Sequence, residues 1–140
     1  MSDAAATLAA PIVLRHKDKD YPLSPLTLDD MSMFERWLEN RAFDTITVRK
    51  GHIDDDDYNR LLTAWIGQCA SGQYRCGSKI GRAACSSEDG MRFLFFLMLA
   101  KETPSMTQKI SDRIFDEQRA EATAKMEVAN AHPLADAGAA

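Results

Sequence analysis

The sequence predicts a mainly α protein: a small helical domain of about four helices with a short N-terminal β-hairpin. Three observations support this fold class. The 140 residues fit a single domain, and 45% of them are hydrophobic, which is enough to fill a core. Apolar residues recur at helical spacing in several segments that begin with capping or acidic residues. A short β-type segment with a polar turn precedes them.

The charge balance and the length of the apolar segments exclude several classes of protein. Lys and Arg together number 17 and Asp and Glu 21, so the formal charge is −4. An acidic chain is not expected to coat nucleic acid, since phosphate binding needs a basic face. The longest apolar segment, residues 91–100, is shorter than the roughly 20 residues that span a membrane. The N-terminus lacks a secretory signal, so we expect a cytosolic protein with no membrane partner.

The N-terminal part predicts a flexible arm over residues 1–10 and a hairpin over residues 11–23. Ile12 and the two residues after it favour a strand, and residues 17–20 make a polar turn. Pro22 marks the returning strand as short or at an edge, because proline cannot donate to the ladder.

Two helices are predicted next. The first covers residues 28–43, and the second begins at residues 54–57 and runs to about residue 70. Thr27 is a suitable cap for the first of them, with two aspartates in its first turn. Four consecutive aspartates, residues 54–57, precede the second. They lack the alternating ligands, central glycine and closing glutamate of a calcium loop. We therefore interpret them as a helix N-terminus, where negative charge is favourable.

Residues 71–90 are rich in glycine, serine and cysteine and predict a long loop with about one helical turn over residues 79–84. The order Gly-Ser-Lys differs from the Gly-Lys-Ser/Thr of a phosphate loop, and a predicted helix precedes it instead of a strand. The basic side chains of this segment form a candidate anion-binding patch: Arg75, Lys79 and Arg82.

The cysteines and histidines do not form a recognisable reactive pattern. Cys69, Cys76 and Cys85 are separated by gaps of six and eight residues, unlike the CxxC pairs of zinc sites. An odd number of cysteines fits no closed set of disulfides, so three reduced thiols are expected. No nucleophile has a base in a known local pattern, and no cofactor fingerprint is present. The sequence predicts no catalytic residue, no metal site, no cofactor and no enzyme.

A third helix is expected to start at Ser86 or Ser87 and to include residues 91–100. That segment is apolar on almost every side, which is typical of a buried central helix. The alternative is that one of its faces stays open for a partner.

A fourth helix is predicted from the spacing of Ser105 and Gln108, which matches a capping box. Its apolar residues end at Phe115. We therefore place the single domain at residues 11–118 and a partly helical or loose tail at residues 119–140.

Two parts of this chain are similar to small tail proteins of phages and prophages. The first comprises residues 20–30 and 34–39, Asp-Tyr-Pro-Leu-Ser-Pro-Leu-Thr-Leu-Asp-Asp and Phe-Glu-Arg-Trp-Leu-Glu. The second runs from Ser87-Glu-Asp-Gly through an aromatic-rich helix to Thr-Pro-Ser-Met-Thr107. Together they resemble the tail assembly chaperones and their relatives over residues 19–115, with the cysteine-containing middle unmatched.

The resemblance implies a small, mostly helical, non-enzymatic chaperone in the cytoplasm of the bacterial host. Such proteins bind the tape measure protein, help to bring tail tube protein to it and are absent from the finished virion. Covering a partner helix needs an apolar groove. We expect the groove to be formed by Phe93, Phe95, Phe96, Leu99, Ile110, Ile114 and Phe115.

Two other functions remain open at this point. One is a structural tail or head–tail connector component that is retained in the virion tail. The other is a phosphate or nucleic-acid binder that uses the basic patch. The net negative charge of the chain disfavours this function. A homo-oligomer is compatible with each of them.

Overall fold

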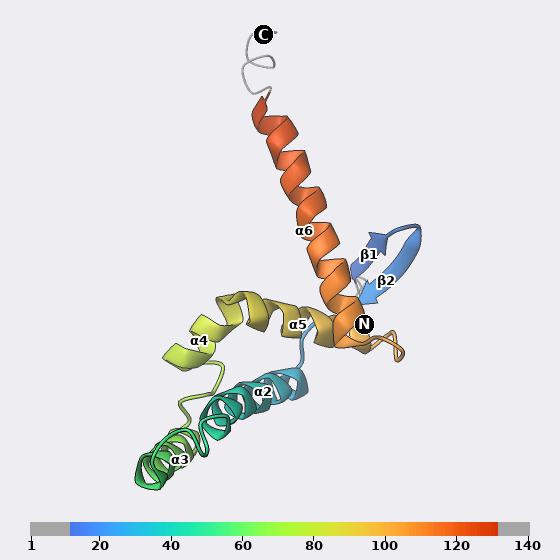
Figure 1. The fold of residues 1–140 in the computed structure, drawn as a ribbon. Helices are drawn as coiled ribbons and strands as arrows, with labels where there is room; N and C mark the ends of the chain where they lie inside the picture. Colours follow the sequence, from blue (N-terminus) through green and yellow to red (C-terminus); the bar gives the residue numbers. More distant parts are fainter. Residues whose placement is uncertain (1–11, 132–140) are drawn as a thin grey trace, which may run out of the picture. The chain divides into compact units, whose positions relative to one another are not determined.

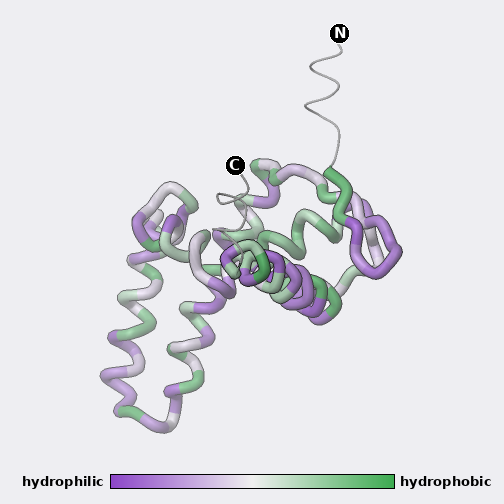
Figure 2. Tube along the Cα trace, turned by 90° about the horizontal axis from the view of Figure 1, so that it is seen from above, coloured by the Kyte–Doolittle hydropathy of each residue, from purple (hydrophilic) through white to green (hydrophobic). Residues whose placement is uncertain are grey.

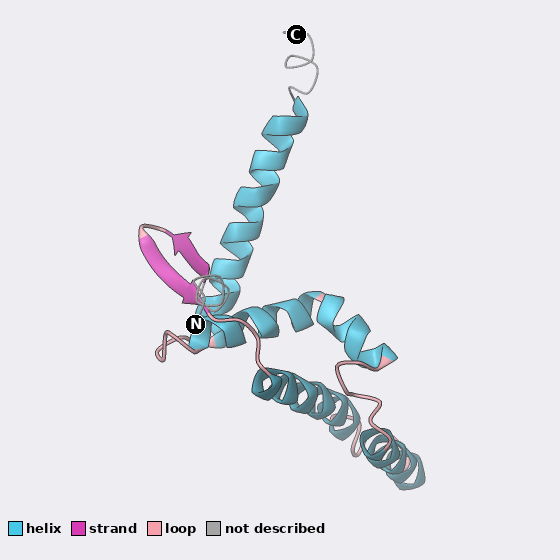
Figure 3. Cartoon of the chain, turned by 180° about the vertical axis from the view of Figure 1, so that it is seen from behind, coloured by secondary structure: helices cyan, strands magenta, loops and turns pink. Residues whose placement is uncertain are grey.

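The computed structural model describes residues 12–131. The arm expected over residues 1–10 and the end of the expected tail, residues 132–140, lie outside this range. The elements, in order, are β1 (Ile12–His16), β2 (Lys19–Leu23), α2 (Leu28–Thr47), α3 (Asp55–Ala70), α4 (Lys79–Ser86), α5 (Glu88–Ala100) and α6 (Gln108–Ala131) (Figure 1). The predicted fold class, mainly α with an N-terminal hairpin, is confirmed (Figure 3).

The chain divides into two compact units. The helical unit is Pro25–Leu97, and the hairpin unit is Met1–Ser24 together with Met98–Ala140, of which residues 12–24 and 98–131 are described. The division falls inside α5. Each unit is considered by itself below, and the single domain over residues 11–118 stays a prediction.

The hairpin has a tighter turn than the sequence suggested. β1 and β2 pair antiparallel, with Ile12 opposite Leu23 and His16 opposite Lys19. The two residues between the strands, Lys17 and Asp18, have positive φ angles of 48° and 60°. Positive φ at both central residues is the feature of a type I′ turn, whose twist matches that of the strands. The predicted four-residue turn is therefore reduced to two residues.

Helix α2 begins where it was predicted and ends later. Thr27 and Asp30 form a reciprocal capping box, with each side chain accepting a hydrogen bond from the other residue's backbone N–H. The helix continues to Thr47, past the predicted end at residue 43. Thr45 and Thr47 donate their hydroxyl hydrogens to carbonyls of the preceding turn, so these β-branched residues are accommodated within the helix.

Helix α3 starts directly after Asp54 and has three aspartates in its first turn. The Asp54 side chain makes no capping hydrogen bond, so the acidic run acts through the helix dipole. Figure 2 shows α2 and α3 side by side and antiparallel, joined by a short connection.

Helix α4 corrects the prediction of a long loop with one helical turn. The Ser78 hydroxyl accepts a hydrogen bond from the Gly81 N–H at 3.0 Å and donates to the Arg75 carbonyl at 2.6 Å. A Cβ at Gly81 would lie 1.9 Å from that carbonyl oxygen, so the close approach requires glycine here. With this helix, the described residues contain five helices where about four were predicted.

Helix α5 begins at the predicted cap but is less buried than expected. The Ser87 hydroxyl accepts from the Gly90 N–H at 3.1 Å and donates to the Ala84 carbonyl at 2.6 Å. Of the seven large apolar residues at positions 93–99, Leu97 and Leu99 are buried and the other five are half-buried. The expectation of a helix buried on every side is therefore wrong.

Helix α6 starts two residues later than the capping box would place it. Thr107, and not Ser105, caps the helix by accepting from the Ile110 N–H at 3.2 Å. The helix continues to Ala131, and each of the residues 119–131 is exposed. This half is rich in good helix formers and contains the Glu121–Lys125 pair at 3.6 Å, which accounts for its helical conformation without packing. The described part of the predicted tail, residues 119–131, is thus helical.

Candidate functional site

Aromatic side chains from α2 and α5 form a cluster inside the helical unit. Phe34 is completely buried. Beside it, the Trp37 and Phe93 rings stack with 4.8 Å between centroids and 5° between planes. Phe93 in turn lies 6.4 Å from Phe96. Rings in this range attract each other beyond the area that they bury, so the cluster fixes α5 against α2.

An arginine and an aspartate complete this cluster at the start of α5. The Arg41 guanidinium lies 4.7 Å from the centroid of the Trp37 ring. Its Nη2 atom is 2.7 Å from the Asp89 carboxylate, which stands in the first turn of α5. Both charged side chains are about half exposed, so the pair itself adds at most about 1 kcal/mol. Tryptophan and arginine are the side chains most enriched at the energetic centres of protein interfaces.

The predicted groove residues fall into two sets. Phe93, Phe95 and Phe96 belong to the helical unit and are half-buried. The hairpin unit holds the other four, Leu99, Ile110, Ile114 and Phe115.

Two residues of the second set are inaccessible. Leu99 is 0% exposed and Ile114 is 3% exposed, so neither is available to a partner. Ile110 is 38% exposed, and the Phe115 ring lies 5.5 Å from the Arg119 guanidinium. The expectation that Leu99 and Ile114 line an open groove is therefore corrected: they are interior residues.

The site residues predicted from the sequence did not include Trp37 or Arg41. A signal was present, since these residues are four positions apart and such residues meet on one helix face. A tryptophan followed four residues later by an arginine predicts a cation–π contact.

Carboxylates lie close to one residue of the candidate anion-binding patch. Arg75 lines a polar cleft of the helical unit together with the carboxylates of Glu35 and Glu39. Lys79 and Arg82 are exposed on α4. An anion bound at Arg75 would meet two carboxylates, so the geometry does not favour anion binding by this loop.

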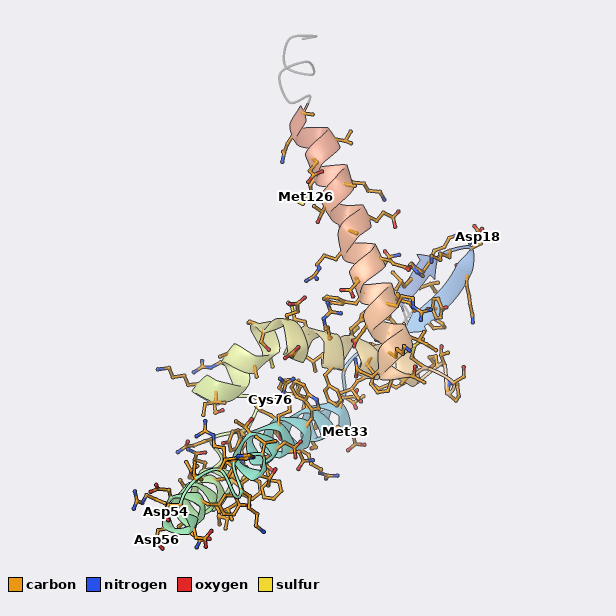
Figure 4. All side chains as sticks on the ribbon, in the orientation of Figure 1. Asp18, Met33, Asp54, Asp56, Cys76 and Met126 are labelled. Atoms are coloured by element: carbon orange, nitrogen blue, oxygen red, sulfur yellow. The ribbon has the colours of Figure 1, made fainter. Side chains whose placement is uncertain are left out.

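Two thiols of the helical unit, Cys69 and Cys76, have a pKa that their surroundings raise. The Cys76 N–H donates to a Glu35 carboxylate oxygen at 2.8 Å, and its thiol donates to the Met31 carbonyl at 3.7 Å. Cys76 is labelled in Figure 4. Burial raises the pKa of the Cys76 thiol, and the Glu35 carboxylate raises this pKa further. For Cys69, burial and then Glu39 raise the pKa. A thiol with a raised pKa is a poor nucleophile and a poor metal ligand at neutral pH.

A polar network joins the hairpin to α6 in the hairpin unit. His16 Nε2 donates to Glu117 Oε2 at 2.6 Å, and Gln118 Nε2 donates to His16 Nδ1 at 2.8 Å. Lys17 Nζ donates to the other Glu117 oxygen at 3.1 Å. The hydrogen bond from Lys17, followed by the one from His16, lowers the pKa of the Glu117 carboxyl. These contacts span about a hundred residues of sequence, so no local pattern reveals them.

Within residues 12–131, no group of three or more His, Cys, Asp or Glu side chains is placed to hold a metal ion. None of the described helices is both long enough and apolar enough to cross a membrane. No protein-family model, curated protein or solved structure matches the chain.

Proposed function

We propose that this chain is a non-enzymatic protein of the tail assembly chaperone type. It binds an apolar segment of the tape measure protein in the host cytoplasm and assists assembly of the tail tube. The observation that supports the proposal is the incomplete burial of α5, the most apolar of the helices in residues 12–131. The resemblance of the chain's sequence to tail assembly chaperones suggests the tape measure protein as the partner.

The binding surface in this proposal is the accessible part of α5 within the helical unit. Phe95 and Phe96 are half-buried there, and Met91 is 41% exposed. Covering such side chains contributes about 25 cal/mol for each Å² of apolar surface removed from water. Trp37 and Arg41 lie on α2, where the Trp37 ring stacks on Phe93 of α5. The pair supplies a rigid aromatic edge to the proposed surface.

The proposal is tested by co-expressing the chain with the tape measure protein of the same genome and purifying the complex by a tag on the latter. Met91→Asp and Phe95→Asp should both abolish co-purification, because each places a carboxylate in an apolar contact. The matched control is Ile66→Asp on α3, where the replaced side chain is also apolar and 59% exposed. This control should co-purify at the level of the unchanged protein.

Circular dichroism and the melting temperature of each purified variant separate loss of binding from loss of folding. Met91 is the decisive position, since its exposure makes the folded state tolerant of a charge. Retained co-purification of a folded Met91→Asp variant would contradict the proposed surface. A stoichiometric amount of the chain in mature particles would instead favour the structural tail or connector component.

A further inference from the structure

The hairpin unit contains a second candidate site, a pocket between the hairpin and the first half of α6. Its walls carry the cationic side chains of Lys17, Lys19 and Arg113. Tyr21 and Ile110, which is 38% exposed, supply an aromatic and an aliphatic surface in the same pocket. The pocket therefore combines positive charge with apolar area.

The one acidic residue in this pocket is already engaged. Glu117 accepts hydrogen bonds from His16 and from Lys17, at 2.6 and 3.1 Å. Lys19 contacts the Tyr21 ring at 5.2 Å, and Arg113 makes no ion pair with any residue in the described part of the chain. With His16 neutral, the three cations and Glu117 leave a formal charge of 3 − 1 = +2, against −4 for the whole chain. A concave site of one charge sign concentrates ligands of the opposite sign.

We propose that this pocket binds an acidic peptide segment in which a carboxylate side chain stands next to an apolar one. The Arg113 guanidinium matches the planar geometry of a carboxylate, and Ile110, which is 38% exposed, offers contact to the neighbouring apolar side chain.

The lining favours a carboxylate over a free phosphate. Phosphate sites typically use backbone N–H groups at a helix N-terminus or in a glycine-rich loop. Ile110 is the pocket residue in the first turn of α6, and its N–H is already bonded to Thr107 at 3.2 Å. The Ile110 N–H is therefore not a free donor for a phosphate group. The inference is independent of the proposed function, which concerns the helical unit.

The test is fluorescence anisotropy of the full chain with a short fluorescein-labelled peptide in which Glu and Leu alternate. Binding should weaken about fivefold in Arg113→Gln and in Lys19→Gln, the change that corresponds to an exposed ion pair. The matched control is Arg82→Gln on α4, which removes an exposed cation from the other unit and should leave the affinity unchanged. All three side chains are exposed, so folding should be retained, which circular dichroism verifies.

Three results would overturn the inference. One is equal affinity for a peptide with Gln in place of each Glu, because the carboxylates would then be irrelevant. Another is an equal loss in Arg82→Gln and Arg113→Gln, which would indicate unspecific attraction to charge. The third is displacement of the peptide by inorganic phosphate at a similar concentration, which would assign the pocket to a phosphate group. The inference is supported if binding weakens in Arg113→Gln and Lys19→Gln but not in Arg82→Gln, and if neither the Gln peptide nor phosphate displaces the acidic peptide.

Discussion

The two units of this protein hold their elements together by different kinds of contact. In the helical unit, α2 and α5 are joined by aromatic rings around the fully buried Phe34. In the hairpin unit, β1 and α6 are joined by hydrogen bonds that connect His16 with Glu117 and Gln118. Ring packing depends little on pH or salt, whereas the polar network depends on the charge of a carboxylate. The comparison predicts that changes in pH and salt alter the stability of the hairpin unit more than that of the helical unit.

The largest effect is expected from Phe34→Ala. Removing a completely buried ring should lower the free energy of unfolding by about 3–5 kcal/mol, because a cavity remains beside Trp37 and Phe93. Chemical denaturation followed by tryptophan fluorescence measures the change. Ile66→Ala, at a 59% exposed position of α3, should cost far less. Similar losses in both variants would contradict the view that the ring cluster is the centre of this unit.

Gly90→Ala tests the close approach between α4 and α5. A Cβ at this position would lie 1.8 Å from the Ala84 carbonyl oxygen, so the backbone must shift, at a cost of about 2 kcal/mol. Gly67→Ala in α3 is the matched control, since its Cβ would meet nothing within 4 Å. That variant should gain about 0.5–1 kcal/mol from higher helix propensity. Thermal melts of the two proteins should therefore shift in opposite directions.

His16→Ala should release the hairpin from α6. The imidazole is 10% exposed and makes two hydrogen bonds, so its loss should cost about 1–2 kcal/mol. Amide hydrogen exchange should accelerate in β1 and β2 and stay unchanged in α3. Equal acceleration in α3 would show that the polar network also supports the helical unit.

Ser111→Ala should stabilise the hairpin unit slightly. The Ser111 hydroxyl is completely buried and has no hydrogen-bond partner among the described residues. Removing it should gain about 1 kcal/mol, because an unsatisfied polar group is lost and alanine favours the helix. An unchanged or lower melting temperature would indicate that a water molecule bonds this hydroxyl.

The smallest effect is the loss of stability expected when Glu117 is protonated at low pH. The pKa of Glu117 is below its ordinary value of 4.5 in the folded protein, mainly because Lys17 donates a hydrogen bond to the carboxylate. A lowered folded pKa gives stability that is complete above the unfolded value and is lost as the pH falls through the folded one. Denaturation curves at a series of pH values below 4.5 should show this loss. Glu117→Gln should lose less stability over the same interval, and an identical fall in both proteins would contradict the network.

Local features of the fold were predictable because neighbouring residues create them. The Thr27 cap requires Asp30 three positions later, and the Ser87 cap requires the amide of Gly90 at the same spacing. Hydrogen bonds of this range form within one turn of chain, so adjacent residue types are sufficient to predict them. Helix α4 was predicted only as about one turn over residues 79–84, whereas it runs from Lys79 to Ser86. Its cap, Ser78, also bonds the Arg75 carbonyl, a contact that glycine-rich sequence patterns do not reveal.

Tertiary structure alone decided which apolar and polar side chains became candidate sites. The residues at 93–99 are almost uniformly apolar, yet Leu99 is buried whereas Phe95 and Phe96 are half-buried. Arg113 and Lys19 meet at one pocket although the sequence places them far apart. By itself, the sequence determined where most helices and the hairpin lie and the caps at Thr27 and Ser87, because these depend on contacts within a few residues. The sites depend on contacts between distant segments, which form only when the chain is packed.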